Sequence, residues 1–434
     1  MSVTPRILKG FRDYLPDTML PKQRMLDTVA RTFESFGFGP LQTPALEYAE
    51  VLLGKYGAEG DKLLYRFRDN GDRDVALRYD LTVPLARVVA MAGQIVPPFR
   101  RYQIAPVWRA EAPGRGRFRE FLQCDVDIVG VEDLTADAEC LAVGAAVLDA
   151  LGVERYVLRV NNRKLLTGML DKLAIAEGEP ALAALRTLDK LPKIGEPAVR
   201  GLLATENKLA PAQIDGIFEF LALAPDQITA WFPDGSAGRR GADELATLLR
   251  LAGELGIADR VEVDLSIARG LDYYTGTIYE TFLRDNEGLG SVMSGGRYDE
   301  LLGMFGKGTL PAVGISLGVD RLFAGLLEAG LVQPAPSPAR VLVTVFDDST
   351  RAHSYRVAAA LRAAGIATEV MLQSPRMKKQ LRHADRLGIP HVVVVGPDEI
   401  ARDEVQLKHL ATGEQASLSL DACIQRLADR AAMG

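Results

Sequence analysis

The chain has 434 residues, of which 48% are hydrophobic and 25% charged, and its formal net charge is −6. This length favours two or three globular domains, and the acidic balance argues against nonspecific coating of nucleic acid, although local basic patches can still bind it. No apolar run reaches membrane-spanning length, and the first residues lack the apolar core of a signal peptide. We therefore expect a cytoplasmic protein that does not enter a membrane.

Histidine and cysteine are scarce and badly placed for common hydrolytic and zinc-dependent sites. All four histidines lie beyond residue 340, and the three cysteines, Cys124, Cys140 and Cys423, are far apart with no CxxC pair. Upstream of residue 340 this excludes a histidine general base and a Ser-His-Asp triad, and we expect no zinc. Chemistry there must use arginine, carboxylates, tyrosine, backbone groups or a metal ion held by oxygens.

In chain order, helical spacing over residues 22–35 is followed by a hairpin pattern over 64–76, where Asn70 and Gly71 form the turn. Strand patterns then cover residues 99–112, 118–130, 261–268, 277–282 and 311–317, and a helix pattern covers 319–329. Strands with hairpin connections predict a large, mostly antiparallel sheet with helices packed on it.

Two segments differ from this sheet region. Residues 164–255 are rich in Leu, Ala, Glu and Lys at helical spacing, which predicts a helical insertion for packing or partner contacts. Residues 333–339 contain three prolines and predict an extended linker. Beyond the linker, short strand and helix patterns alternate, so residues 340–434 are expected to form a small α/β domain.

Residues 269–280 combine an arginine, acidic residues, three tyrosines and two glycines. Tyr273 and Tyr274 would point to opposite faces of an extended chain. Gly270 and Gly276 allow close approach of the backbone. A segment with this many polar residues does not suit a hydrophobic core, and it predicts a small polar pocket.

A second polar cluster follows two neighbouring strand patterns. Arg109 lies near the end of one, and Gln123, Asp125 and Asp127 alternate along the next, so these three side chains share a face. Burying such a face without ligands is costly, which favours a binding surface. The alternative is a solvated outer face with cross-strand salt bridges.

Three shorter motifs carry further candidates. Asp80 and Thr82 could hold an ammonium group, or Thr82 could be the N-cap of a helix. The glycine pair in residues 294–299 permits tight passage of the backbone. Arg321 follows a glycine-rich strand end, where its guanidinium could stack on a purine or stay exposed on a helix. These glycines fit neither the Walker nor the dinucleotide-binding loop.

Together these patterns resemble the class II aminoacyl-tRNA synthetases. Residues 38–47, 99–130 and 314–322 are similar to the three motifs of that class, with Arg109 in the second motif and Arg321 in the third. Residues 269–280 and 294–299 resemble the two histidine motifs of the histidyl-tRNA synthetase family, and residues 9–16 match the family opening. The resemblance covers nearly the whole chain, and its first histidine motif is highly specific.

The resemblance implies an α+β fold: a class II synthetase-type antiparallel sheet with flanking helices and a helical insertion, followed by a small C-terminal α/β domain. We expect a catalytic domain in two parts, residues 1–163 with motifs 1 and 2, and residues 256–332 with the histidine motifs and motif 3. Residues 164–255 would form the insertion, 333–339 the linker, and 340–434 an anticodon-binding domain.

The implied site residues fall into two groups, and none is a metal ligand. Arg109 and Arg269 would be catalytic and contact the α-phosphate of ATP, Glu111 would lie near the nucleotide, and Arg321 would stack on adenine. Two fixed cations can stabilise charge that develops at phosphorus without any proton transfer. The residues implied in histidine binding are Asp80, Thr82, Gln123, Asp127, Arg269, Tyr273 and Tyr274. The first three would hold the α-amino group, whereas Asp127 and Tyr274 would reach the imidazole.

The implied activity is that of a histidine–tRNA ligase, with ATP as a substrate, Mg²⁺ bridging its phosphates, and no zinc. L-histidine and tRNA-His would be the other partners, and a homodimer is expected. The alternative is a non-catalytic relative, acting as the regulatory subunit of ATP phosphoribosyltransferase or as a tRNA-binding sensor. The domain after the linker and the intact segment around Arg269 argue against it. The chain has Asp80 and Asp127 where glutamate is frequent in the family, which implies a reshaped pocket.

Overall fold

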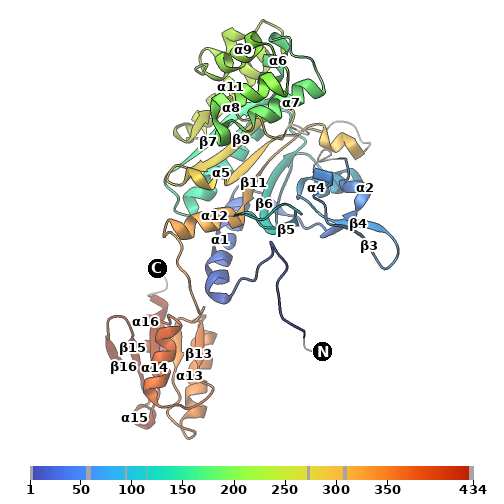
Figure 1. The fold of residues 1–434 in the computed structure, drawn as a ribbon. Helices are drawn as coiled ribbons and strands as arrows, with labels where there is room; N and C mark the ends of the chain where they lie inside the picture. The colour runs from blue at the N-terminus through green and yellow to red at the C-terminus, as the bar shows by residue number, and fades with distance from the viewer. Residues whose placement is uncertain are drawn as a thin grey trace. The chain divides into compact units, whose positions relative to one another are not determined.

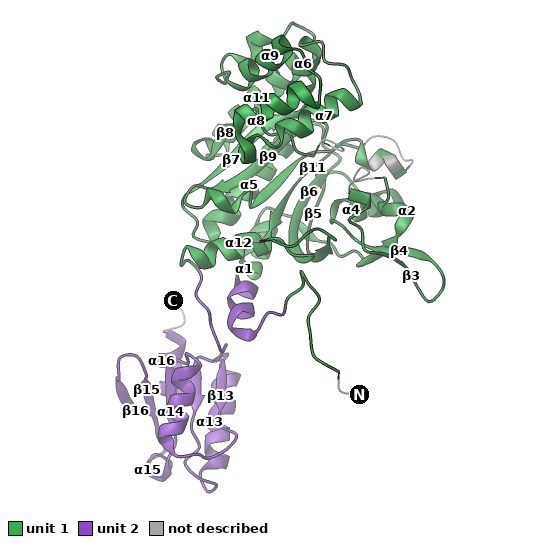
Figure 2. Ribbon diagram, viewed as in Figure 1, with its two compact units in different colours: residues 1–12, 25–331 green, residues 13–24, 332–434 purple. Residues whose placement is uncertain are grey.

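The computed structural model describes residues 3–54, 60–92, 95–114, 116–270, 274–305 and 310–429. The chain divides into two compact units, one formed by residues 1–12 and 25–331 and the other by residues 13–24 and 332–434 (Figure 2). Helix α1 (Pro16–Ser35) spans the division. Within the described ranges, every helix is too short or too polar to cross a bilayer.

The larger unit is built on an eight-stranded sheet with the order β1-β5-β6-β11-β10-β9-β7-β8 (Figure 1). Its strands are β1 (Gly39–Pro40), β5 (Phe99–Trp108), β6 (Glu120–Val129), β7 (Tyr156–Asn162), β8 (Val261–Val263), β9 (Thr277–Leu283), β10 (Met293–Arg297) and β11 (Ala312–Gly318). The outermost pairs, β1–β5 and β7–β8, are parallel. The five pairs between them are antiparallel, which confirms the predicted type of sheet.

Two of the helices that pack on this sheet cover its middle strands. Helix α5 (Thr135–Ala150) is apolar on nearly all sides, which is typical of a buried helix, and it covers β6, β10 and β11. Helix α12 (Val319–Glu328) follows β11 and packs against β6 and β11. Three short 3₁₀ segments complete this part: η1 (Ala258–Arg260), η2 (Glu287–Leu289) and η3 (Leu301–Phe305).

A small three-stranded sheet with the order β2-β4-β3 carries the predicted hairpin. Its elements are β2 (Leu46–Tyr48), α2 (Ala49–Leu52), β3 (Arg66–Arg68), β4 (Asp74–Leu77) and the following helix α4 (Thr82–Met91). The Gly71 backbone N–H donates to Asp69 Oδ1 (2.9 Å), which closes the turn expected at Asn70 and Gly71. Leu52, Leu85 and Ala76 are buried in the core beneath this sheet.

The predicted insertion is helical throughout its regular elements. It contains α6 (Arg163–Lys172), α7 (Glu179–Leu188), α8 (Leu191–Thr205), α9 (Pro211–Leu221), α10 (Ile228–Trp231) and α11 (Ala237–Glu254). Figure 1 shows α6 to α9 and α11 gathered beside β7 and β9. Helix α11 buries Leu245, Leu248 and Ala252 at helical spacing. The exact limits of the insertion and of the other domains stay a prediction.

The smaller unit holds the predicted C-terminal α/β domain. Its five-stranded sheet has the order β13-β12-β14-β15-β16, in which β12, β13 and β14 are parallel. The strands are β12 (Val341–Val343), β13 (Thr368–Val370), β14 (His391–Val394), β15 (Val405–His409) and β16 (Gln415–Leu418). The helices are α13 (Arg351–Ala363), α14 (Met377–Arg386), α15 (Pro397–Ala401) and α16 (Leu420–Asp429).

Two local expectations were wrong for identifiable reasons. The strand expected over residues 261–268 ends at Val263, because the Asp264 carboxylate accepts the Ser266 N–H (3.0 Å) and forms a turn. Thr82 is not an N-cap but the first residue of α4. The Asp80 side chain takes the capping role instead, since its Oδ1 accepts the Val83 N–H (3.1 Å).

Gly314 is a position where the main sheet leaves no room for a side chain. An added Cβ would lie 2.1 Å from Asp127 Oδ1 and 2.7 Å from the Val126 carbonyl oxygen. We expect Gly314→Ala to lower the free energy of unfolding by about 3 kcal/mol, because the strands must separate to relieve the overlap. Urea unfolding measures this change.

A matched control is Gly201→Ala in α8, where an added Cβ meets no atom within 4 Å. It should leave the free energy of unfolding unchanged or raise it by about 0.5–1 kcal/mol. Equal unfolding midpoints for the two variants would contradict the packing between β6 and β11.

Candidate active site

The register of the central strands brings polar and small residues together on one face of the main sheet. One rung across the sheet contains Arg101, Asp127, Gly314 and Gly296. The next rung on that face contains Asp125, Ser316, Ser294 and Glu280. Because the glycines and serines add little bulk, the middle of the face is hollow.

A cavity of about 280 Å³ lies over this face. The predicted residues that line it are Asp80, Thr82, Arg109, Gln123, Asp127, Arg269 and Tyr274. A second cavity of about 200 Å³ is lined by Arg109, Glu111, Arg269 and Arg321. Arg109 and Arg269 line both cavities, so the two adjoin. Tyr273 lies outside the described residues, and the ligand roles of the others stay predictions.

Arg109 is held between two aromatic rings. Its guanidinium carbon lies 4.4 Å from the centre of the Tyr79 ring and 5.1 Å from that of Phe121. Its Nε donates to the Tyr79 carbonyl oxygen (3.2 Å). These contacts fix the direction of the side chain while leaving a cation at the junction of the two cavities.

Asp127 is held by two donors that the sequence did not suggest. Arg101, which is fully buried, pairs with it across the strands (Nη2–Oδ2 2.6 Å), and the buried Tyr298 hydroxyl donates to its Oδ1. Burial raises the pKa of Asp127, whereas Arg101 and the Tyr298 hydrogen bond oppose the rise. The carboxylate is therefore fixed in orientation at the floor of the cavity.

Asp125 is a further cavity residue, seen on the shared strand face but not assigned to the site. It is 3% exposed, and burial raises its pKa to about 7, against the opposing charge of Arg101. Asp127 and Asp80 add to the rise, which places three carboxylates close together. Within the described residues its Oδ1 accepts no hydrogen bond. The alternative of a solvated strand face is thus wrong.

Gln123 and Thr82 complete the polar wall at this end of the cavity. Gln123 is 8% exposed and its Nε2 donates to Ser316 Oγ on the neighbouring strand (2.8 Å). That contact orients the amide, while Oε1 accepts no hydrogen bond among the described residues. An amide oxygen and carboxylates facing one space suit a cationic ligand group.

Arg269 lies between two carboxylates. Its Nη1 is 2.9 Å from Oε1 of Glu280, which is nearly buried on β9, and its Nε is 3.4 Å from Oδ1 of Asp189. Burial raises the pKa of Glu280, and Arg269 opposes that rise. The cation therefore favours the charged form of this buried carboxyl and is in turn held at the cavity wall.

Tyr274 owes its position to two glycines. An added Cβ at Gly270 (φ +63°) would lie 1.9 Å from the Tyr274 ring, and one at Gly296 would lie 2.9 Å from it. The Tyr274 backbone N–H donates to the Gly270 carbonyl oxygen (2.9 Å). Gly270, where close approach was expected, and Gly296, where tight passage of the backbone was expected, thus make room for the tyrosine ring.

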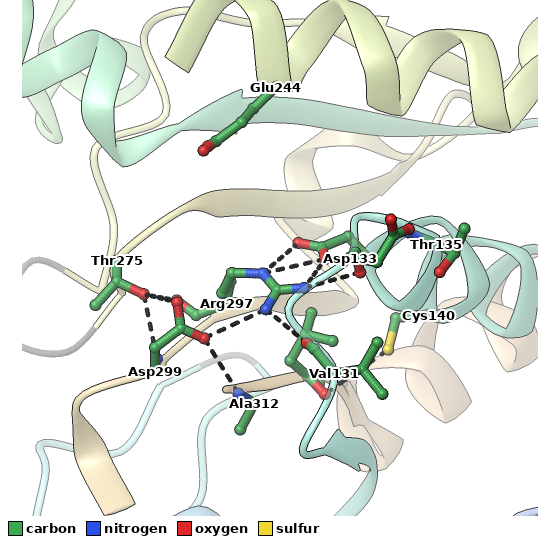
Figure 3. Close-up of polar contacts among 12 residues, drawn as sticks. Val131, Asp133, Thr135, Cys140, Glu244, Thr275, Arg297, Asp299 and Ala312 are labelled. Atoms are coloured by element: carbon green, nitrogen blue, oxygen red, sulfur yellow. Dashed lines mark hydrogen bonds and ion pairs between the residues drawn. The ribbon is translucent and has the colours of Figure 1, made fainter. Parts of the chain in front are cut away.

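A buried polar network behind the cavity fixes the segment that carries Tyr298 (Figure 3). Arg297 forms an ion pair with the buried Asp137 at the start of α5, and its Nη1 donates to the Val131 carbonyl oxygen (2.9 Å). Asp299 accepts the Ala312 N–H of β11 (3.2 Å) and the Thr275 hydroxyl (3.2 Å).

These contacts tie β10, β11 and the residue next to Tyr274 together. The network therefore sets the relative positions of two tyrosines in the cavity wall, Tyr274 and Tyr298. Their place in the wall is fixed from behind, by side chains that do not themselves line the cavity.

Arg321 is half-buried rather than exposed on its helix. Its Nη1 donates to the Ser291 carbonyl oxygen (2.6 Å), and burial lowers its pKa, with Arg117 and Arg269 adding to the effect. The N-terminal segment supports the same helix, because Arg12 Nη2 contacts Asp320 Oδ1 (2.5 Å). The alternative of a solvated Arg321 is therefore wrong.

Comparison with known proteins agrees with this arrangement. Residues 10–322 match the family model described as histidyl-tRNA synthetase, and residues 340–430 match that of an anticodon binding domain. The curated histidine–tRNA ligases of Rhodopirellula baltica and Wolinella succinogenes are 42% and 43% identical to this chain. The two alignments cover 96% and 98% of this chain, and they cover 96% and 98% of the respective relatives.

The crystal structure of histidyl-tRNA synthetase from Nostoc sp. PCC 7120 superposes with a TM-score of 0.89 at 35% identity. The match covers 99% of this chain and 100% of that one. The two family models taken together, the curated relatives and the solved structure all span both units. The chain therefore belongs to the histidyl-tRNA synthetase family.

Proposed function

We propose that this protein is a histidine–tRNA ligase, which activates L-histidine with ATP and transfers it to the 3′ end of tRNA-His. The observation that carries the proposal is the pair of adjoining cavities, with Arg109 and Arg269 where they meet. Carboxylates are the more frequent charged residues in the wall of the first cavity, and arginines in that of the second. The names of the curated relatives support the same activity.

In the activation step, a carboxylate oxygen of histidine attacks the α-phosphorus of ATP and pyrophosphate leaves. Arg109 and Arg269 both line the two adjoining cavities and would stabilise the negative charge that grows on the phosphate. No side chain is needed as a base, because the attacking carboxylate is already deprotonated at neutral pH. In the second step a ribose hydroxyl of the terminal adenosine attacks the acyl carbon, AMP leaves, and a phosphate oxygen accepts the proton.

Histidine recognition would use the carboxylate-lined cavity. Asp80, Thr82 and Gln123 present oxygens to the α-amino group, and the fixed Asp127 carboxylate would accept an N–H of the imidazole. Tyr274 would serve the other ring nitrogen. A pocket that bonds both imidazole nitrogens rejects amino acids with apolar side chains more strongly than a purely apolar pocket could.

The second cavity would take the nucleotide, with Arg321 over adenine and Glu111 beside the ribose or phosphates. Magnesium prefers carboxylate, phosphate and water oxygens, and Glu111 is a carboxylate in the wall of the second cavity that fits this preference. The ion would neutralise charge on the phosphates of ATP. Within the described ranges, no three His, Cys, Asp or Glu side chains form a metal-holding group by themselves.

The remaining proposals concern assembly, location and tRNA. Leu46, inside the segment that resembles the first class motif, and Tyr48, just after it, are 44% and 52% exposed, which supports a homodimer through this segment. Residues 340–430 would bind the anticodon, as the description of their family model suggests. A cytoplasmic location is consistent with L-histidine, ATP and tRNA-His as the substrates.

One experiment separates the ligase from the non-catalytic alternatives. Histidine-dependent exchange of pyrophosphate into ATP requires formation of the adenylate, which neither a regulatory subunit nor a tRNA sensor performs. We expect exchange with histidine and none with other amino acids. Absence of exchange with every amino acid would contradict the ligase.

Arg269→Ala should lower the exchange rate about 10²- to 10³-fold, because it removes one of two cations at the reacting phosphate. The matched control is Arg284→Ala, since Arg284 has a similar exposure and also forms an ion pair, with Glu262. This control should retain the wild-type rate. Urea unfolding establishes that both variants fold, and a wild-type exchange rate in Arg269→Ala would show that the site lies elsewhere.

The raised pKa of Asp125 predicts a pH-dependent stability. In the unfolded chain this carboxyl ionises near pH 4, whereas in the folded protein it ionises at about pH 7. Between these values the folded state alone holds the proton, so stability falls as the pH rises, by up to about 4 kcal/mol. The loss is complete above pH 7.

Asp125→Asn cannot titrate, so the stability of this variant relative to the wild type should increase from pH 5 to pH 8. Urea unfolding at both pH values measures the difference. Asp226→Asn, which changes an exposed carboxylate, is the control, and its free energy of unfolding should change with pH as that of the wild type does. A difference between Asp125→Asn and wild type that is the same at pH 5 and pH 8 would contradict the assigned protonation.

A further inference from the structure

The helical insertion contributes a carboxylate to the wall of the active site. Asp189 lies between α7 and α8, and its Oδ1 is 3.4 Å from Arg269 Nε. With Pro192 and Lys193 it lines a cavity of about 420 Å³, which Arg269 and Glu280 also line. A segment that the sequence assigned to packing or partner contacts thus touches the proposed catalytic arginine.

The sheet topology explains how the insertion arrives there. Strand β9 pairs with β7, and the insertion leaves the sheet at the end of β7. The Arg163 N–H at the start of α6 donates to the Gly276 carbonyl oxygen just before β9 (2.7 Å). The first helix is therefore anchored beside the strand that follows Arg269, and the α7–α8 junction meets that arginine.

The two carboxylates beside Arg269 are not equivalent. The Glu280 side chain is 5% exposed on a central strand, and its contact with the guanidinium is the shorter. The Asp189 side chain is 37% exposed on a separate helical module. Asp189 also raises the pKa of Glu280, although less than burial does, so the charge of Asp189 acts on a residue of the active-site wall. Glu280 alone is placed to orient Arg269, which leaves Asp189 available for a different role.

A triphosphate that approaches Arg269 would meet Asp189 as a like charge. Building on the proposed ligase function, we propose that Asp189 is a positioning residue that competes with the phosphates of ATP for Arg269. Nucleotide binding then releases the α7–α8 junction from the active site. Through this contact the position of the insertion and the affinity for ATP depend on each other.

The kinetic test is Asp189→Asn in histidine-dependent pyrophosphate exchange. The KM for ATP should fall about two- to fivefold, as expected for loss of a partly exposed ion pair that competes with the substrate. The kcat and the KM for histidine should stay at wild-type values. Asp226→Asn, which removes an exposed charge from the same insertion, should change none of the three.

An unchanged or raised KM for ATP in Asp189→Asn overturns the proposal. If the wild type shows no exchange at all, the ligase function fails instead, so the two failures are distinguishable. A purely structural role for Asp189 would lower the thermal midpoint and leave the KM for ATP unchanged, which also counts against the proposal.

A second measurement needs no active variant. Hydrogen exchange of the wild type with and without an unreactive ATP analogue should show faster exchange of amides in residues 186–194 when the analogue is bound. In Asp189→Asn these amides should exchange fast in both states. Equal exchange in the wild type with and without the analogue would overturn the proposal independently of catalysis.

Discussion

The buried ion pair between Arg101 and Asp127 is the interaction on which the pocket depends. Arg101 is fully buried and Asp127 is 3% exposed, so neither charge has water to stabilise it. Such pairs seldom stabilise a fold more than apolar residues of the same size, but removal of one partner leaves a buried charge at a cost of several kcal/mol. The pair is better explained by the position it gives to Asp127 than by stability, because it fixes the orientation of this carboxyl group beneath the cavity.

The surrounding structure holds that carboxylate in register. Gly314 leaves room for Asp127 on the neighbouring strand, and the Tyr298 hydroxyl occupies its other oxygen. Tyr298 is in turn fixed by the contacts of Arg297 and Asp299 with α5 and β11 (Figure 3). A pocket held this way has little freedom to adapt, which suits the recognition of one amino acid by directed hydrogen bonds.

Much of this arrangement could be predicted from the sequence, and the limits have physical causes. Alternation along one strand predicted the shared face of Gln123, Asp125 and Asp127, because the strand period is fixed. The partners from other strands could not be predicted, since Arg101 meets Asp127 only through the pairing register. The sequence alone likewise did not connect Arg297 with Asp137, or Asp189 with Arg269. The turn at Asp264 was missed because a side-chain hydrogen bond ended an apolar strand pattern.

The separation of charge across the two cavities also follows from the fold. Asp125 and Asp127 come from one strand in the middle of the sheet, whereas Arg109 and Arg321 come from the ends of β5 and β11, where the chain leaves the sheet. A zwitterionic amino acid between them would turn its ammonium group to the carboxylates and its carboxylate to the arginines. That orientation points the nucleophilic oxygen at the α-phosphate of ATP. The same distribution of charge would therefore both bind the substrate histidine and orient it, in a unit whose own sequence contains no histidine.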